Sequence, residues 1–285
     1  MGLVERTEQL DLRPASWYRS TFATAAPEPV LGEELPAGWE GVHFPFETPF
    51  AQLREDGSPA EDGVLPIIDL PRRMYAGEDT EFLAPLRYGD VVTQRTSLGS
   101  LVEKQGRAGR LVFADLVREY LVDGEVAVRS TWHDVFLEAQ PAVPSPRTSA
   151  PEVAAEDAVD PDAGADWTVT RSLDSRQLFR FSAVTGNTHR IHYDRQWARE
   201  VEGLDDLLVH GPLTRILVLD ALTANAGGRR LASVRFRAKA PVLVDTAFRI
   251  AGTDGPEGTS VVVRAADGTV LASADATWRA ALHGA

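Results

Sequence analysis

The chain has 285 residues, of which 44% are hydrophobic and 25% charged, and its formal net charge at pH 7 is −13. This composition is typical of a folded globular protein with one large domain or two of ordinary size. The negative charge argues against nucleic acid as a partner, since no run of Lys and Arg offsets it locally. Because the chain has no cysteine, disulfides, thiolate nucleophiles and Cys-ligated metal centres are excluded.

The sequence carries no signal for a membrane. Residues 1–12 lack the apolar run of a secretory leader. The most apolar candidate helix, residues 215–222, is short and is interrupted by Asp220. We therefore expect a cytoplasmic protein that does not bind membranes.

The first half of the chain is predicted to consist mainly of strands. Its one candidate helix is placed at residues 43–56. Three segments of strand character follow, and the Asp123-Gly124 pair between the last two is typical of a two-residue hairpin. These segments are residues 82–98, 109–122 and 125–139.

Residues 139–165 are rich in Pro, Ala and acidic residues and show no apolar periodicity. This composition predicts an extended, partly mobile linker. In polyproline form, at roughly 3.1 Å per residue, the linker reaches on the order of 80 Å, which is enough to cross the face of a domain. We therefore predict two domains, residues 1–138 and 166–285, packed side by side.

The second half is predicted to contain three helices followed only by strands. Asp174 and Asp194 are typical helix N-caps, and Gly211-Pro212 is a typical start for a longer apolar helix. The expected helices are residues 175–184, 195–202 and 213–226. The expected strands are residues 167–174, 231–241, 246–252, 259–265 and 269–280, with Asp267-Gly268 as the last hairpin.

The two halves end in the same order of features. Each has a proline, an aspartate, a long strand, an Asp-Gly hairpin and a strand that carries a tryptophan, Trp132 or Trp278. This order indicates a weak internal duplication. We predict an α+β fold in which each half is a long helix wrapped by an antiparallel sheet. The two tryptophans are most simply core residues.

Polar residues gather in the stretch TGNTHRIHY, residues 185–193, and a His210-Gly211 pair follows it. Such a set fits a proton-transfer site, a metal site or a polar turn. We expect His192 to be exposed at the turn between two short helices, where a neutral imidazole can both accept and donate a proton. The alternative is a histidine that only caps a helix or lies on the surface.

Gly211 is the second candidate. Glycine allows close approach of the backbone, and an N–H at the positive end of a helix is suited to a developing oxyanion. The alternative is an ordinary helix start, for which Gly-Pro is equally well suited.

A metal site would have to draw on His189, His192, His210 and Asp194. No His-Glu-x-x-His helix is present in the sequence, and nothing fixes three of these side chains on one face. A serine hydrolase is disfavoured because the Gly-x-Ser-x-Gly turn is absent. We therefore expect no metal.

The stretches FSAVTGNTHRIHYDRQWA and LLVHGPLTRILVLDAL resemble the hydratase motif of the MaoC-like dehydratases, a hot-dog-fold family whose pattern is Ser-Gly-Asp-x-Asn-Pro-Ile-His and then His-Gly. In the first half, RRMYAGEDTEFLAPLRYGD and GRLVFADLVREYLVDG look like the degenerate N-terminal dehydratase domain of members with two hot-dog domains. The resemblance covers the chain from about residue 40 to the end. It is nearest to the mesaconyl-C4-CoA hydratases and the type 2 3-hydroxyacyl-thioester dehydratases, and it implies a double hot-dog fold.

The resemblance also implies an enzyme, a hydro-lyase. His192 takes the place of the family's catalytic histidine, and Gly211 that of the residue whose N–H holds the thioester oxygen. Asn187 stands where the general pattern has a catalytic aspartate, a change that the nearest subgroup shares. Because an amide cannot accept a proton as a carboxylate does, we expect Asn187 to orient the water that His192 activates. No cofactor is implied.

The implied ligand is an acyl thioester carried by CoA or by a carrier protein. Its pantetheine would lie between the two halves, and the degenerate first half would leave space for a bulky or branched acyl group. The alternatives are a thioesterase, which would require a carboxylate to activate water, and a noncatalytic protein that binds acyl thioesters. Two fused hot-dog domains fit either a monomer or a homodimer. The residues predicted to contact substrate are Arg72, Arg73, Tyr75, Gly77, Arg190, Tyr193 and His210. The arginines among them would bind a carboxylate of the substrate or the phosphates of CoA.

Overall fold

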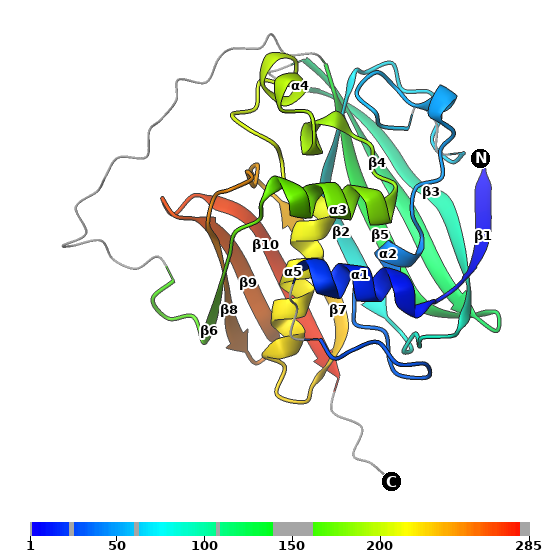
Figure 1. The fold of residues 1–285 in the computed structure, drawn as a ribbon, viewed down its shortest axis with the longest axis vertical. Helices are drawn as coiled ribbons and strands as arrows, with labels where there is room; N and C mark the ends of the chain where they lie inside the picture. The colour runs from blue at the N-terminus through cyan, green and yellow to red at the C-terminus, as the bar shows by residue number, and fades with distance from the viewer. Residues whose placement is uncertain (1, 23–25, 60–62, 107–108, 139–161, 280–285) are drawn as a thin grey trace.

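The computed structural model describes residues 2–22, 26–59, 63–106, 109–138 and 162–279. Its strands form one antiparallel sheet in the order β1-β3-β4-β5-β2-β7-β10-β9-β8-β6 (Figure 1). The first half supplies β1 (Leu3–Gln9), β2 (Arg72–Phe82), β3 (Val91–Gly106), β4 (Gly109–Val122) and β5 (Glu125–Leu137). The second half supplies β6 (Trp167–Arg171), β7 (Arg230–Ala238), β8 (Phe248–Gly255), β9 (Gly258–Ala265) and β10 (Val270–Arg279).

The strand order repeats itself about the junction between β2 and β7. From this junction outward, each half runs in the order of its second, fifth, fourth, third and first strands. The predicted internal duplication is therefore present in the topology. Both predicted Asp-Gly hairpins are also found, with Gly124 and Gly268 each at φ 85°.

The helices lie against the concave side of the sheet (Figure 1). The longest, α5, lies within the second half's strands, and most of its side chains are buried. The α-helices are α1 (Leu12–Phe22), α2 (Glu40–His43), α3 (Ser175–Thr185), α4 (Arg195–Glu200) and α5 (Gly211–Ala224), and the 3-10 turns are η1 (Phe50–Gln52) and η2 (Arg190–His192). The three helices predicted for the second half are confirmed.

The helix predicted at residues 43–56 is wrong. That segment holds only the end of α2 and the turn η1. Pro45 and Pro49 explain the error, because proline lacks the N–H that a helix interior needs and disfavours helical geometry in the residue before it. In chain order α2 stands where α5 stands in the second half, so the expectation of a long helix in each half fails for the first.

Strands β1 and β2 were not predicted as strands. β2 lies in the middle of the sheet, between β5 and β7, yet it is rich in charged residues that obscure the alternation of a strand. Of the predicted linker, residues 139–161 lie outside the described residues. Residues 162–165 form a turn, and Asp162 pairs with Arg249 of β8 at 2.9 Å and with Arg264 of β9 at 3.2 Å.

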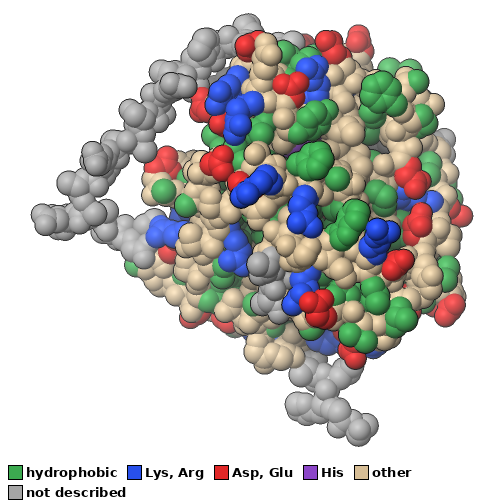
Figure 2. All heavy atoms as spheres, in the orientation of Figure 1, with side chains coloured by type: hydrophobic (Ala, Val, Ile, Leu, Met, Phe, Trp, Pro, Cys, Tyr) green, Lys and Arg blue, Asp and Glu red, His purple; other side chains and the backbone are tan. Residues whose placement is uncertain are grey.

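Lys and Arg side chains are interspersed with Asp and Glu over the face seen in Figure 2, with no large field of one sign. Within the described residues, no helix has the length and apolar character needed to span a membrane.

Helix α3 leads directly into the polar stretch 185–193, and a capping box fixes its start. The Asp174 carboxylate accepts hydrogen bonds from the backbone N–H groups of Arg176 and Gln177, and the Gln177 side chain accepts from the Asp174 N–H. The helix ends at Gly186, whose left-handed conformation at φ 62° is a usual helix C-cap.

We predict that Asp174→Ala destabilises the protein by about 1 kcal/mol, because two N–H groups at the start of α3 lose their acceptor. Urea unfolding would measure the loss. The control is Asp205→Ala, which removes an exposed carboxylate without a side-chain hydrogen bond among the described residues. Equal unfolding midpoints for the two variants would show that the cap contributes nothing.

Candidate functional site

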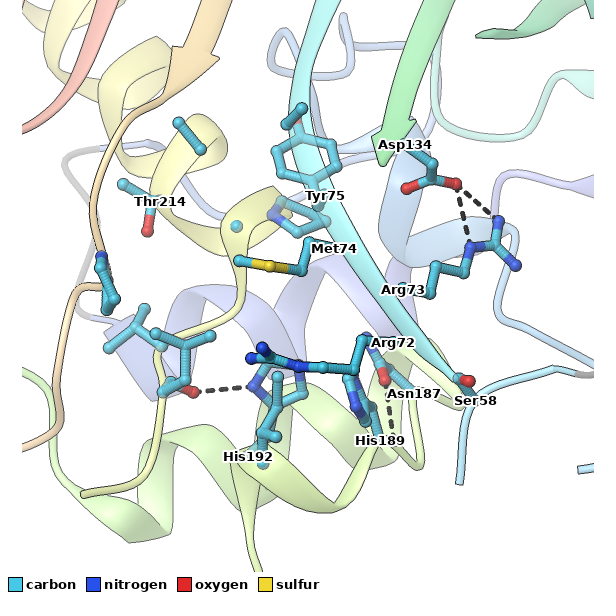
Figure 3. A pocket seen from close by; sticks show the side chains of 18 of the residues that line it. Ser58, Arg72, Arg73, Met74, Tyr75, Asp134, Asn187, His189, His192 and Thr214 are labelled. Carbon is cyan, nitrogen blue, oxygen red and sulfur yellow. Dashed lines mark hydrogen bonds and ion pairs between the residues drawn. The ribbon is translucent and has the colours of Figure 1, made fainter. Parts of the chain in front are cut away.

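A cavity of about 680 Å³ lies between the two halves and is the candidate site. Its walls come from the polar stretch 186–192, from the start of β2 and from the first turn of α5. In Figure 3, Asn187, His189 and His192 lie on one side of this cavity, with Met74 and Tyr75 of β2 across from them. Its size and mixed apolar and polar lining are typical of a small-molecule site.

His192 is held in one orientation. It is the last residue of η2, and its ring stacks on that of His210, with centroids 3.6 Å apart and planes 19° apart. Its Nδ1 lies 2.7 Å from the Leu208 carbonyl oxygen, which can only accept, so Nδ1 carries the proton. Nε2 therefore holds a lone pair, and it makes no hydrogen bond within the described part of the chain.

His192 is not exposed as predicted; its exposure is only 5%. Burial, with a smaller effect from nearby His189, lowers the pKa of His192 to about 3, although the bond to Leu208 acts in the opposite direction. Burial likewise lowers the pKa of His210 well below its usual value. The imidazole of His192 is therefore neutral at physiological pH and available as a proton acceptor.

His210 lies behind His192. It is fully buried, its Nε2 is 2.9 Å from the Ser182 hydroxyl, and its ring meets that of Phe181 edge-on. It does not line the cavity. We therefore interpret His210 as a support for the His192 ring rather than as the direct substrate contact that the sequence suggested.

Asn187 lines the cavity beside His192. Its Oδ1 accepts a hydrogen bond of 3.1 Å from the His189 backbone N–H, which holds the turn closed. Its Nδ2 donates to no described residue. The free end of this amide is thus a donor, which complements the acceptor Nε2 of His192.

Gly211 is the first residue of α5, and its N–H donates to no acceptor among the described residues. The Tyr75 ring of β2 packs directly on it, since a Cβ added at Gly211 would lie 2.3 Å from Tyr75 Cδ1. Only glycine fits at this point of close approach. The structure thus brings Asn187, His192, Gly211 and Tyr75, which the sequence singled out, to one cavity.

A first-half loop that the sequence analysis did not assign to the site covers the polar turn. The Asp56 carbonyl accepts from the Arg190 N–H at 2.7 Å, and the Gly57 carbonyl accepts from the Thr188 hydroxyl at 2.7 Å. A Cβ at Gly57 would lie 2.0 Å from the Thr188 carbonyl oxygen. The signal in the sequence was the Asp56-Gly57 pair, which is a common turn signature.

Arg72 and Arg73, which were predicted to contact substrate, line the cavity, but each has a carboxylate partner. Arg72 pairs with Glu202 at 2.8 Å, and Arg73 pairs with Asp134 at 2.7 Å, as Figure 3 shows for the second pair. Asp134 also accepts from the indole N–H of Trp132 at 2.9 Å. Within the protein these charges are already compensated, so neither arginine is an unpaired receptor for an anion.

Three other predicted contacts lie outside the cavity lining. Arg190 pairs with Asp194 at 2.7 Å and stacks on Trp197, while the Tyr193 hydroxyl donates to the Thr188 carbonyl. Gly77 lies in β2 at φ 154°, beside a β-bulge, where a Cβ would be 2.2 Å from the Phe236 carbonyl oxygen. Its role is to let β2 approach β7 and to direct Tyr75 toward the cavity.

Within the described residues, no group of three or more His, Asp or Glu side chains is placed to hold a metal ion. His189, which also lines the cavity, comes within 3.8 Å of the Asp56 carboxylate but forms no hydrogen bond with it.

Comparisons with known proteins agree with this geometry. Residues 38–244 match the family model described as hydroxyacyl-thioester dehydratase type 2. The chain is 32% identical over 279 residues to a mesaconyl-C(4)-CoA hydratase of Chloroflexus aurantiacus, covering 96% of each chain.

Among solved structures, HtdX of Mycobacterium tuberculosis superposes with a TM-score of 0.67 at 17% identity, covering 97% of this chain and 100% of that one. Another M. tuberculosis protein, described as having a double hot-dog fold, superposes with a TM-score of 0.56 at 13% identity, covering 97% and 95%. At these identities the two structures show the fold alone, and they confirm the double hot-dog prediction. Because the family model spans most of the sequence, the chain belongs to the hydroxyacyl-thioester dehydratase type 2 family.

Proposed function

We propose that this chain adds water reversibly across the α,β double bond of an enoyl thioester, with His192 as the acid-base group. Membership in the family makes it a hydro-lyase of acyl thioesters. The observation that carries the proposal is that one cavity is lined both by His192, whose Nε2 is a free acceptor, and by Asn187, whose Nδ2 is a free donor.

This pair suits a single water molecule. Asn187 donates to the water oxygen, and His192 Nε2 accepts one of its protons as the oxygen bonds to Cβ. The electron pair of the double bond moves to the thioester oxygen, where the N–H of Gly211 at the positive end of α5 stabilises the enolate. His192 then returns the proton to Cα, so that water is consumed and the histidine is regenerated.

No step of this scheme uses a metal or redox cofactor, and we propose that none takes part. The acyl group is proposed to be branched or mesaconyl-like, in keeping with the named relative. We propose CoA as the carrier, with an acyl-carrier protein as the alternative. We also propose that the protein is cytoplasmic and that it acts as a monomer or a homodimer.

One assay separates the enzyme classes. The protein is incubated with crotonyl-CoA and with mesaconyl-CoA while the enoyl absorbance and free thiol are followed together. Loss of absorbance without thiol supports hydration. Release of thiol would show a thioesterase, and the absence of both changes would leave a noncatalytic acyl-thioester binding protein.

We predict that His192→Ala lowers kcat by roughly 10² to 10⁴-fold, because the group that takes the proton from water is lost. The matched control is His133→Ala, which removes a histidine on β5 that pairs with Asp115 and lies outside the cavity. Full hydratase activity in the His192 variant would refute the assignment.

We predict that Asn187→Asp lowers kcat by about 10-fold or more, since a carboxylate cannot donate the hydrogen bond that the amide gives to water. Asn187→Ala should lose a similar factor. Steady-state kinetics with both variants measure this directly. A gain of activity in the Asp variant would instead identify the site as a weakened form of the carboxylate-containing motif.

We predict that kcat/KM shows no acid limb centred near pH 6.5, the usual imidazole pKa. Because the folded-state pKa of His192 is lowered to about 3, the neutral, active form persists as pH falls through 6.5. The unfolded state gains that proton first, so the fold loses stability below pH 6.5. The profile is therefore measured from pH 5.5 to 8 with circular dichroism as a check on folding. An inflection near 6.5 in folded protein would contradict the assignment of a buried, neutral His192.

A further inference from the structure

A second cavity of about 340 Å³ opens in the first half, beside the short helix α2. In the order of elements along the chain, the four-residue helix α2 of this half takes the position that the long helix α5 has in the second half. The cavity is floored by inward-facing residues of β3 and β4 and bounded by residues 38–49. A larger share of its wall is polar than in the first cavity.

The two cavities adjoin. They share seven lining residues, which include Arg73, Trp132, Asn187 and Pro212. The rings of Tyr75 and Trp132 meet at 4.6 Å, and Tyr75 packs on Gly211. A thioester whose carbonyl lies at Gly211 and whose double bond lies at Asn187 therefore has the far end of its acyl group directed at the border with the second cavity.

Four arginines line this second cavity, and three of them have carboxylate partners: Arg6 with Glu47 at 3.5 Å, Arg73 with Asp134 at 2.7 Å, and Arg215 with Glu78 at 3.4 Å. Arg118 is the exception. Its side chain forms no hydrogen bond or ion pair with any other residue that the structure describes.

Arg118 is nonetheless held in place. Its guanidinium lies 4.4 Å from the centroid of the Trp132 ring, and it sits on the concave face of β4 opposite Thr96 and Ser130. Stacking on an indole fixes the plane of a guanidinium and leaves its N–H edges free for a planar anion. Thr96, which also lines the cavity, adds a hydroxyl beside it.

We propose that the second cavity receives a carboxylate at the far end of the acyl group and that Arg118 binds it. Arg118 thereby distinguishes the mesaconyl-like acyl group proposed above, which carries a second carboxylate, from a simple alkenoic acid, which does not. Arg118 is a specificity-determining residue that acts at the end of the acyl group remote from the thioester. This assignment rests on the proposed hydration of an enoyl thioester and narrows its substrate.

The test uses two thioesters that differ at one position. Fumaryl-CoA and crotonyl-CoA are both trans-enoyl thioesters, and they carry a carboxylate and a methyl group, respectively, on Cβ. We expect Arg118→Met to lower kcat/KM for fumaryl-CoA by about 10-fold to 100-fold, the range for a charge-assisted hydrogen bond, and to change that for crotonyl-CoA by less than about threefold. Arg118→Lys should lie between wild type and Arg118→Met for fumaryl-CoA, because it keeps the charge and loses the paired donors.

The control variant is Arg129→Met, which removes an arginine from the outer face of the neighbouring strand β5, where it pairs with Glu119 and Glu81. It should leave both rates unchanged. An equal loss for both thioesters in Arg118→Met would show that Arg118 only supports the fold, and no loss for either would show that the carboxylate does not reach it. Both results overturn the proposal.

A binding measurement keeps this proposal separate from that of hydration. Succinyl-CoA and butyryl-CoA are the saturated pair, and calorimetry gives their affinities without any reaction. Tighter binding of succinyl-CoA that disappears in Arg118→Met supports the carboxylate site even if the wild type hydrates neither enoyl thioester. Equal binding of the pair by wild type and variant would refute the site even if crotonyl-CoA is hydrated.

Discussion

The antiparallel pairing of β2 with β7 is the contact on which the rest of the site depends. It joins the halves into one sheet through five residue pairs, from Gly77 opposite Arg237 to Glu81 opposite Ser233. Two glycines make the approach possible. Gly77 lets the strands meet, and Gly211 lets the Tyr75 ring pack against the start of α5. The first half thereby becomes a wall of the cavity that holds the second half's polar turn.

Burial determines the chemistry of that turn. An exposed His192 would be partly protonated near neutral pH, whereas the buried ring is neutral, has a fixed tautomer and shares its cavity with the donor amide of Asn187. Where α5 meets the first half, by contrast, buried charge is compensated by pairing. Arg215 of α5 lies 3.4 Å from Glu78 and 4.0 Å from Glu40, whose own pKa burial raises. Removing one partner of such a cluster is costly, because the other charge stays buried.

The sequence predicted the fold where local chemistry and periodicity agree. Asp174, Asp194 and Gly211 mark helix starts in the structure as they do in the sequence, because caps act on their own neighbours. The family motif likewise led to Asn187 and His192. The features that the sequence did not predict depend on contacts with residues far away in the chain. The charged strand β2 is stabilised by β5 and β7, the loop around Asp56 is positioned only by folding, and the burial of His192 comes from His210 and Leu208. Arg118 likewise could not be singled out from other arginines until the structure showed it stacked and unpaired within the described chain.

A single histidine that both takes the proton from water and returns it to Cα must work on one face of the substrate. The measurement that tests this most directly is the stereochemistry of hydration in deuterium oxide. With crotonyl-CoA we predict a 3-hydroxybutyryl product in which the new hydroxyl and the new deuterium were added to the same face, as read from the proton coupling constant by NMR. Addition to opposite faces would require a second acid-base group and would contradict the role assigned to His192.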